Sequence, residues 1–325
     1  MSKAIRIHRP GGPEEMVWEE VEVGAPGPGQ ALLRQAAVGL NYIDVYHRTG
    51  LYPLPVMPAV LGMEAAAVVE AVGEGVSDIR PGQRVAYASP PPGSYAERRL
   101  MPADRLVPLP DAIDDRQAAA MMLQGMTAQY LLRRTYRVQP GDAILVQAAA
   151  GGVGTILCQW GRYLGATVIG TVGSDAKAEI ARANGCHHVI NYTREAFAPR
   201  VRELTGGEGV AVVYDGVGKT TFDGSLDSLR MLGMLVSYGN ASGPVPPFEP
   251  AILSQKGSLF FTRPTLMNYT AKTADLRASA AELFEVVAGG HVKITVSQTY
   301  PLAEAAQAHR DLEARKTTGS TVLLP

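Results

Sequence analysis

Residues 144–154 read ILVQAAAGGVG and join an apolar strand to a glycine-rich turn and the start of a helix. The continuous apolar run predicts a buried strand of a parallel sheet. Gly151, Gly152 and Gly154 then let the backbone come close to a pyrophosphate, and the free amides and dipole of the following helix favour a phosphate there. The expected contacts are Gly151, Gly152 and Val153. Ala149 replaces the first glycine of G-x-G-x-x-G, so the motif is degenerate. The stretch favours a dinucleotide site, with close packing of small residues as the alternative.

Beyond this stretch strands and helices alternate, which is typical of right-handed β-α-β crossovers and a parallel sheet. The predicted strands are residues 144–147, 167–172, 188–191, 210–215, 234–238 and 258–261. The predicted helices are residues 153–164, 175–184, 195–204, 221–229 and 273–289. This part of the α/β chain therefore predicts a full dinucleotide-binding sheet of the doubly wound Rossmann type.

The chain before residue 109 is different, since short strand-like segments are separated by turns such as Pro26-Gly27-Pro28-Gly29. This spacing predicts a β-rich, barrel-like domain. A helical pattern follows from Asp114 to Tyr136, and the tail from Thr295 regains strand character and is expected to return to the first domain. We predict one domain from residues 1–125 with 295–325, and a second from residues 126–294.

Composition excludes several classes of function. The chain has 325 residues, with 30 Lys and Arg against 31 Asp and Glu, so no global field attracts nucleic acid or an anionic membrane. No apolar run approaches the ~20 residues of a membrane helix, and the N-terminus lacks a signal-peptide core. Cys158 and Cys186 are the only cysteines, which is too few for a disulfide framework or a cysteine zinc cluster. We expect a cytoplasmic protein.

The residue ending the second predicted strand selects the cofactor, because an acid there binds the ribose hydroxyl of NAD and repels the 2′-phosphate of NADP. That residue is Val172, and it is followed by Gly173, Ser174 and, one turn later, Lys177. Amides, a hydroxyl and a cation suit a phosphate, and Tyr192 after the next strand offers a further donor. We predict NADPH.

Asp175 keeps NAD open as the alternative, because it lies about 20 residues beyond the glycine turn, where NAD-binding sheets carry their acid. The ordinary explanation of these residues is that Asp175 caps the next helix and that Lys177 is solvated.

Several further segments share a pattern with one family. They read GLNYID (39–44), LGMEAAAVV (61–69), QGMTA (124–128), SYGNASG (237–243) and FTRP (261–264). Together with the glycine turn, they make the whole chain resemble the zinc-free quinone oxidoreductases of the medium-chain dehydrogenase/reductase superfamily, the group that includes zeta-crystallin. The resemblance implies a GroES-like catalytic domain built from both chain ends, a Rossmann domain between them and a cofactor in the interdomain cleft. It also implies a homodimer joined through the Rossmann sheets, with residues 258–261 as the edge strand.

The chain departs from the zinc-dependent relatives at their metal ligands. Met63 stands in place of the histidine of a G-H-E motif, Asn41 lies near the position of the missing cysteine, and residues 89–94 replace the four-cysteine lobe. We therefore expect no metal, which disfavours simple alcohol dehydrogenation. A quinone is a strong hydride acceptor, so positioning over the nicotinamide and donors to its oxygen can suffice.

The resemblance also assigns the residues that line the catalytic site. Asn41 orients the nicotinamide ribose or a substrate oxygen, Tyr46 and Tyr52 flank the substrate ring from a Gly/Pro-rich loop, and Thr127 faces the nicotinamide. The alternatives are that the two tyrosines only cover a core and that Thr127 only packs or caps a helix.

Further cofactor contacts are expected at strand ends and near the C-terminus. Tyr238, Gly239 and Asn240 follow the fifth strand, at the carboxyl edge where open α/β sheets bind ligands, and offer backbone contacts to the nicotinamide. Arg263 and Arg315 are expected to close over phosphate or substrate. A solvated helix terminus is the alternative for Arg315.

These observations lead to the hypothesis of an NADPH-dependent, zinc-independent quinone reductase acting on a small-molecule quinone. The closest alternative is an enal or enone reductase that uses the same hydride chemistry on a carbon–carbon double bond. A non-catalytic, crystallin-like NADPH-binding protein is the alternative from another class, because the chain shows no obligatory acid, base or metal. No nucleic-acid or membrane partner is expected.

Overall fold

The computed structural model describes residues 2–325, which form two compact units. Unit 1 contains the chain up to Met126 together with Thr270–Phe284 and Ile294–Pro325, and unit 2 contains Thr127–Tyr269 and Glu285–Lys293. Residues 270–284, which the sequence analysis placed in the second domain, group with unit 1. No helix in residues 2–325 is long and apolar enough to cross a membrane.

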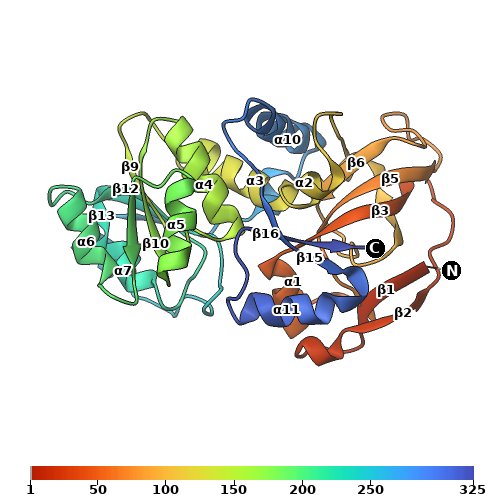
Figure 1. Cartoon of the computed structure of the whole chain (residues 1–325), viewed down its shortest axis with the longest axis horizontal. Helices are drawn as coiled ribbons and strands as arrows, with labels where there is room; N and C mark the ends of the chain where they lie inside the picture. Colours follow the sequence, from red (N-terminus) through yellow and green to blue (C-terminus); the bar gives the residue numbers. More distant parts are fainter. Residues whose placement is uncertain (1) are drawn as a thin grey trace. The chain divides into compact units, whose positions relative to one another are not determined.

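Unit 2 is built on a parallel sheet (Figure 1). Its strands are β9 (Ala143–Val146), β10 (Thr167–Val172), β11 (His188–Asn191), β12 (Val210–Asp215), β13 (Leu229–Ser237) and β14 (Phe260–Thr262). They lie in the order β11-β10-β9-β12-β13-β14. This is the strand order of a doubly wound dinucleotide-binding sheet, so the predicted Rossmann fold is confirmed, with β14 at the edge as expected. The order reverses between β9 and β12, which puts the end of β9 at the position where such sheets bind ligands.

The helices between residues 122 and 288 follow the predicted alternation, although the two short helices within residues 251–269 were not predicted and the last helix lies mostly in unit 1. They are α3 (Met122–Tyr130), the π-helical turn η3 (Leu131–Thr135), α4 (Gly152–Tyr163), α5 (Asp175–Ala183), α6 (Phe197–Leu204), α7 (Phe222–Asp227), α8 (Ala251–Gln255), α9 (Leu266–Tyr269) and α10 (Thr273–Ala288). The core packs Leu145, Ile169 and Val213 from the sheet against Phe222 and Leu226 of α7. Such apolar burial is the main stabilising contribution to a domain of this kind.

Unit 1 is the predicted β-rich domain, and both ends of the chain contribute to it. Its strands are β1 (Ser2–Ile7), β2 (Val17–Val21), β3 (Gln30–Leu40), β4 (Ala59–Val60), β5 (Glu64–Val72), β6 (Arg84–Ala88), β7 (Arg98–Pro102), β8 (Val107–Pro108), β15 (Val296–Pro301) and β16 (Ser320–Leu324). The main sheet has the order β15-β16-β3-β5-β6-β8, with β7 also pairing with β3, and a small sheet has the order β2-β1-β4. Because β16 pairs antiparallel with β3, the tail returns to the first domain as predicted.

The helices of unit 1 include one that the sequence analysis did not predict. They are η1 (Pro13–Glu15), α1 (Tyr42–Thr49), η2 (Ala103–Arg105), α2 (Asp115–Ala119), η4 (Leu302–Glu304) and α11 (Ala305–Glu313). Tyr46, which was expected in a Gly/Pro-rich loop, lies on α1, so that prediction was wrong. The Asn41 amide donates to Asp44 Oδ2 over 2.9 Å and the Asp44 amide donates back to the Asn41 carbonyl, which starts the helix. Gly50, with φ of 80°, ends it.

The predicted helix from Asp114 to Tyr136 is also divided. Helix α2 ends at Ala119, α3 begins at Met122, and the last turn widens into the π-helical η3. The Leu131 carbonyl accepts from the Tyr136 amide, five residues on, over 3.2 Å, which is the π-helical bond, and it also accepts from the Tyr214 hydroxyl over 3.2 Å.

Candidate active site

The glycine turn after β9 leaves the start of α4 open to a ligand. Gly151 is the N-cap of α4, and no side chain caps the helix there. The first amides of α4 are therefore available to an anion. Gly154 has a packing role, since a Cβ at this position would lie 2.3 Å from the Ala148 carbonyl oxygen. This is the close helix–strand contact that the third glycine of the motif provides.

Gly173, Ser174, Lys177 and Tyr192 come together at the ends of β10 and β11. A Cβ on Gly173 would lie 2.4 Å from the Tyr192 hydroxyl, so the phenol lies directly against this glycine. The Ser174 hydroxyl accepts a hydrogen bond from the Lys177 amide over 3.3 Å. Val172, at the end of β10, is buried, so this strand end carries no acid.

Asp175 does not cap helix α5, contrary to the ordinary explanation given for it, because Ser174 holds the N-cap position. Its carboxylate is instead paired with the Arg194 guanidinium and accepts from Asn191 Nδ2 over 3.1 Å. The charge of this acid is therefore balanced locally.

The ends of β12 and β13 form a rigid platform. Buried Asp215 accepts hydrogen bonds from the Gly218 amide and from the hydroxyls of Thr221 and Ser225. The Tyr238 amide donates to the Asp215 carbonyl over 2.8 Å, and a Cβ on Gly239 would lie 2.4 Å from the Gly216 carbonyl oxygen. These contacts fix the backbone of the segment that contains the predicted nicotinamide contacts.

In unit 1, Asn41 is the centre of a buried polar network that the sequence analysis did not predict. Asn41 Nδ2 donates to Glu64 Oε2 over 2.6 Å, and Gln124 Nε2 donates to Asn41 Oδ1 over 3.1 Å. The Ser320 hydroxyl donates to Gln124 over 2.8 Å, and the Leu123 amide donates to the other oxygen of Glu64 over 2.7 Å. The carboxamide of Asn41 is therefore held in one orientation.

Two carboxyl groups beside Asn41 are removed from water. Burial raises the pKa of Glu64 to about 8, although hydrogen bonds from Asn41 and Leu123 oppose the shift. Burial likewise raises the pKa of Asp44 to about 7. A Cβ on Gly39 would lie 2.3 Å from Glu64 Oε2, so Gly39 makes room for this carboxyl. The GLNYID and GME segments were thus informative, but no sequence spacing indicated that Glu64 would bind Asn41.

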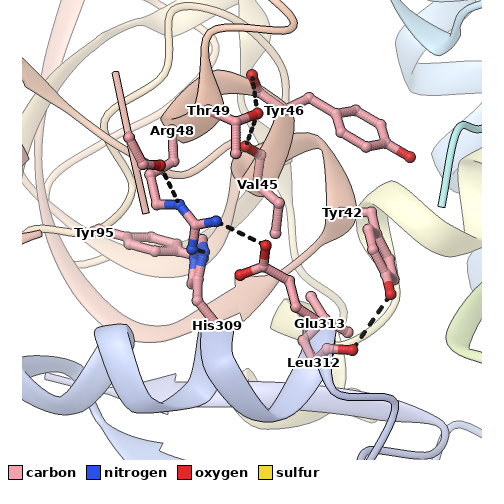
Figure 2. Close-up of polar contacts among 10 residues, drawn as sticks. Tyr42, Val45, Tyr46, Arg48, Thr49, Tyr95, His309, Leu312 and Glu313 are labelled. Atoms are coloured by element: carbon pink, nitrogen blue, oxygen red, sulfur yellow. Dashed lines mark hydrogen bonds and ion pairs between the residues drawn. The ribbon is translucent and has the colours of Figure 1, made fainter. Parts of the chain in front are cut away.

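The remaining predicted substrate contacts are distributed over both units. The rings of Tyr46 and Tyr52 lie 5.1 Å apart in an edge-on arrangement, and in Figure 2 the Tyr46 ring extends away from Arg48 and Tyr95. Tyr46 is buried and Tyr52 is half-buried. Thr127, which is buried on α3, belongs to unit 2. Arg263 also belongs to unit 2, whereas Arg315 belongs to unit 1.

Known proteins match this chain along its entire length. The quinone oxidoreductase of Pseudomonas aeruginosa is 51% identical, with all of both chains covered. The crystal structure of Escherichia coli quinone oxidoreductase complexed with NADPH superimposes with a TM-score of 0.98 at 46% identity, covering 99% of this chain and 100% of that one. The chain belongs to the quinone oxidoreductase family. Within the medium-chain dehydrogenase/reductase superfamily, residues 27–111 match the alcohol dehydrogenase GroES-like domain and residues 184–323 match the zinc-binding dehydrogenase family.

Another relative of similar identity is named for a different activity. The 2-haloacrylate reductase of a Burkholderia species is 51% identical, with 100% of this chain and 99% of the relative covered.

The match to the zinc-binding dehydrogenase family raises the question of a zinc site, and the residues of this chain do not fit one. Met63 offers a thioether, and the nearby Glu64 carboxyl already accepts from Asn41 and Leu123. Within residues 2–325 no group of three or more His, Cys, Asp or Glu side chains is arranged to hold a metal ion. The side chains at this position therefore do not provide the ligand set of a catalytic zinc.

Proposed function

We propose that this protein is an NADPH-dependent quinone reductase. The observation that carries the proposal is the full-length similarity to the E. coli quinone oxidoreductase whose crystal structure contains NADPH. The full-length similarity to curated oxidoreductases also favours an enzyme over a non-catalytic binding protein.

The residues of unit 2 fit NADPH. The uncapped start of α4 would bind the diphosphate through the amides of Gly152 and Val153, with Gly151, whose own amide donates to the Ala148 carbonyl, allowing close approach. The corner formed by Gly173, Ser174, Lys177 and Tyr192 would bind the 2′-phosphate, since Val172 offers no acid to repel it. When bound, NADPH supplies the hydride.

Other side chains would orient the reactants. The platform of Tyr238, Gly239 and Asn240 would hold the nicotinamide, and Arg263 and Arg315 would contact phosphate or substrate. The predicted substrate contacts are Asn41, Tyr46, Tyr52 and Thr127. Their part is to orient the quinone and to donate hydrogen bonds to the oxygen that gains negative charge.

Steady-state turnover tests this function. NADPH and NADH should each be combined with benzoquinones, naphthoquinones and enones, and we expect the highest kcat/KM for NADPH with a quinone. Strong enone turnover with inert quinones would overturn the proposal, as would NADPH binding without oxidation by any acceptor.

A second candidate is reduction of an activated carbon–carbon double bond, which the similarity to the Burkholderia 2-haloacrylate reductase favours. Hydride transfer to an electron-poor alkene needs the same cofactor positioning. Adding 2-chloroacrylate and an unhalogenated enone to the substrate panel separates the candidates, because a quinone reductase turns over neither efficiently.

The proposal includes a homodimer formed through the exposed edge of the unit 2 sheet. The edge strand β14 exposes Phe260 to 55%, and we propose that it pairs with β14 of a second copy in a homodimer. Light scattering after size-exclusion chromatography tests this, and a monomeric mass at micromolar concentration would contradict it. Cytoplasmic location stays a prediction from the sequence.

A further inference from the structure

A buried chain of hydrogen bonds connects α11 to the start of α1 within unit 1. Figure 2 shows the contact between Arg48 and His309 in this chain. Arg48 Nη1 lies 3.2 Å from His309 Nδ1, His309 Nε2 lies 3.1 Å from the Tyr95 hydroxyl, and this hydroxyl lies 3.0 Å from Asp44 Oδ2. None of the four side chains is more than 1% exposed. Hydrogen bonds without competing water are strong constraints on geometry.

The hydrogen bonds of this chain all run in one direction, from Arg48 as the first donor to Asp44 as the last acceptor. A guanidinium only donates, so His309 Nδ1 must accept from Arg48, and the ring proton must be on Nε2. Nε2 then donates to the Tyr95 oxygen, and the Tyr95 proton is donated to Asp44. Burial lowers the pKa of His309 to about 3, which keeps the ring neutral. Because arginine does not release its proton, the chain fixes positions and does not conduct protons.

The last acceptor of this chain holds the residue predicted to contact the substrate. Asp44 Oδ2 accepts from the Tyr95 hydroxyl and also from the Asn41 amide, over 2.9 Å. Asn41 is the N-cap of α1, and Tyr46 lies one turn further along the same helix. A shift of Asp44 would therefore move the backbone from which the Asn41 side chain extends.

The first donor of the chain is itself fixed. Arg48 Nη2 donates to Glu313 over 2.8 Å, and Arg48 Nε donates to the Gly11 carbonyl over 3.2 Å. Near the other end of α1, the Tyr42 hydroxyl donates to the Leu312 carbonyl over 3.3 Å (Figure 2). Helix α1 is thus tied to α11 near both of its ends.

We propose that Arg48, His309 and Tyr95 are positioning residues for quinone reduction, which hold Asn41 and the substrate-contacting helix α1 through Asp44. The inference rests on the proposed function. It assigns these residues an effect on the substrate step and none on NADPH binding.

The test compares Tyr95→Phe with Tyr87→Phe. Both variants delete one fully buried hydroxyl of unit 1, but the Tyr87 hydroxyl bonds Gln35 and Arg99 and is not a member of the chain that ends at Asp44. For Tyr95→Phe we expect kcat/KM for a benzoquinone to fall about 10- to 100-fold, the NADPH dissociation constant to stay within about twofold, and amide exchange of residues 41–49 to accelerate. Tyr87→Phe should leave all three quantities near wild type. Equal losses in both variants, or unchanged quinone kinetics in Tyr95→Phe, would overturn the proposal.

A second pair of variants tests the direction of the chain. The amide nitrogen of His309→Gln reaches close to the position of Nε2 and can still donate to Tyr95, whereas the shorter side chain of His309→Asn cannot. We expect His309→Gln to retain more quinone activity and slower exchange at residues 41–49 than His309→Asn, and the reverse ranking would contradict the assignment. If the wild-type protein reduces no quinone, the proposed function fails, and unaltered amide exchange in Tyr95→Phe would separately refute the positioning role.

Discussion

The methyl group of Ala149 fills the space that Gly170 leaves open. A Cβ on Gly170 would lie 2.6 Å from the Ala149 Cβ and 2.6 Å from Cys186 Sγ. The alanine in place of the first motif glycine is therefore matched by a glycine on the neighbouring strand β10. The turn thus tolerates alanine at its first motif position because Gly170 leaves room for the methyl group.

This contact predicts the effect of adding one methyl group. Gly170→Ala should destabilise unit 2 by about 1–3 kcal/mol, because the added atom overlaps two buried neighbours. Gly170→Ala combined with Ala149→Gly should recover part of the loss, since it removes one of the two overlaps. Urea unfolding measures both, and an unchanged midpoint in Gly170→Ala would contradict the packing argument.

The two turn glycines should differ in what they affect. Gly154→Ala would place a Cβ 2.3 Å from a backbone oxygen and should lower the melting temperature. Gly151→Ala has its nearest contact at 3.2 Å and an allowed φ of -83°, so it should fold normally. If the diphosphate binds over this turn as proposed, the added methyl group should weaken NADPH binding. Differential scanning fluorimetry and NADPH titration separate these effects. A loss of stability in Gly151→Ala equal to that in Gly154→Ala would refute the assignment.

Lys177 should distinguish the two nicotinamide cofactors. A charge-assisted hydrogen bond to the 2′-phosphate predicts that Lys177→Ala raises the KM for NADPH by about tenfold or more and leaves the KM for NADH nearly unchanged. Lys256→Ala is the matched control, since Lys256 pairs with Asp227 at the end of α7. Equal changes for both cofactors would show that Lys177 does not contact the phosphate.

The pH dependence of stability should report the Glu64 carboxyl. Its pKa is raised on folding from 4.5 to about 8, so the folded state binds its proton more tightly, and the free energy of unfolding falls as the pH rises through this range. His309, with its lowered pKa, has the opposite effect below its ordinary value of 6.5, so the clearest window is from about pH 6.5 to 8.

Glu64→Gln should remove a slope of up to about 1.4 kcal/mol per pH unit from this window. Urea unfolding at several pH values measures the difference between the two proteins. The slope due to Asp44, whose pKa is raised to about 7, should remain in both. Parallel stability curves would mean that Glu64 is not protonated on folding.

Local patterns predicted the fold of unit 2 well, because buried parallel strands read as short apolar runs between glycine turns. The predicted bounds of β10, β11 and β12 agree with the structure. Helix α1 was missed because the segment was assigned to a Gly/Pro-rich loop, although its eight residues are amphipathic and Asn41 followed by Asp44 and then Gly50 was a start and stop signal. The bond between Glu64 and Asn41 was unpredictable, since it joins residues from separate elements whose approach depends on the sheet register of β3 and β5.

The pairing of β16 with β3 has a consequence for how the protein is synthesised. Residues 320–324 join β15 to strands β3, β5, β6, β7 and β8, which lie more than 200 residues earlier in the sequence, whereas the strands of unit 2 emerge from the ribosome as one continuous block. Unit 2 can therefore fold during translation, while β3 waits with an open edge until the final residues appear. If translation stopped before residue 320, unit 2 could fold but the edge of β3 would stay unpaired and prone to aggregation. Completion of unit 1 therefore depends on residues 320–324.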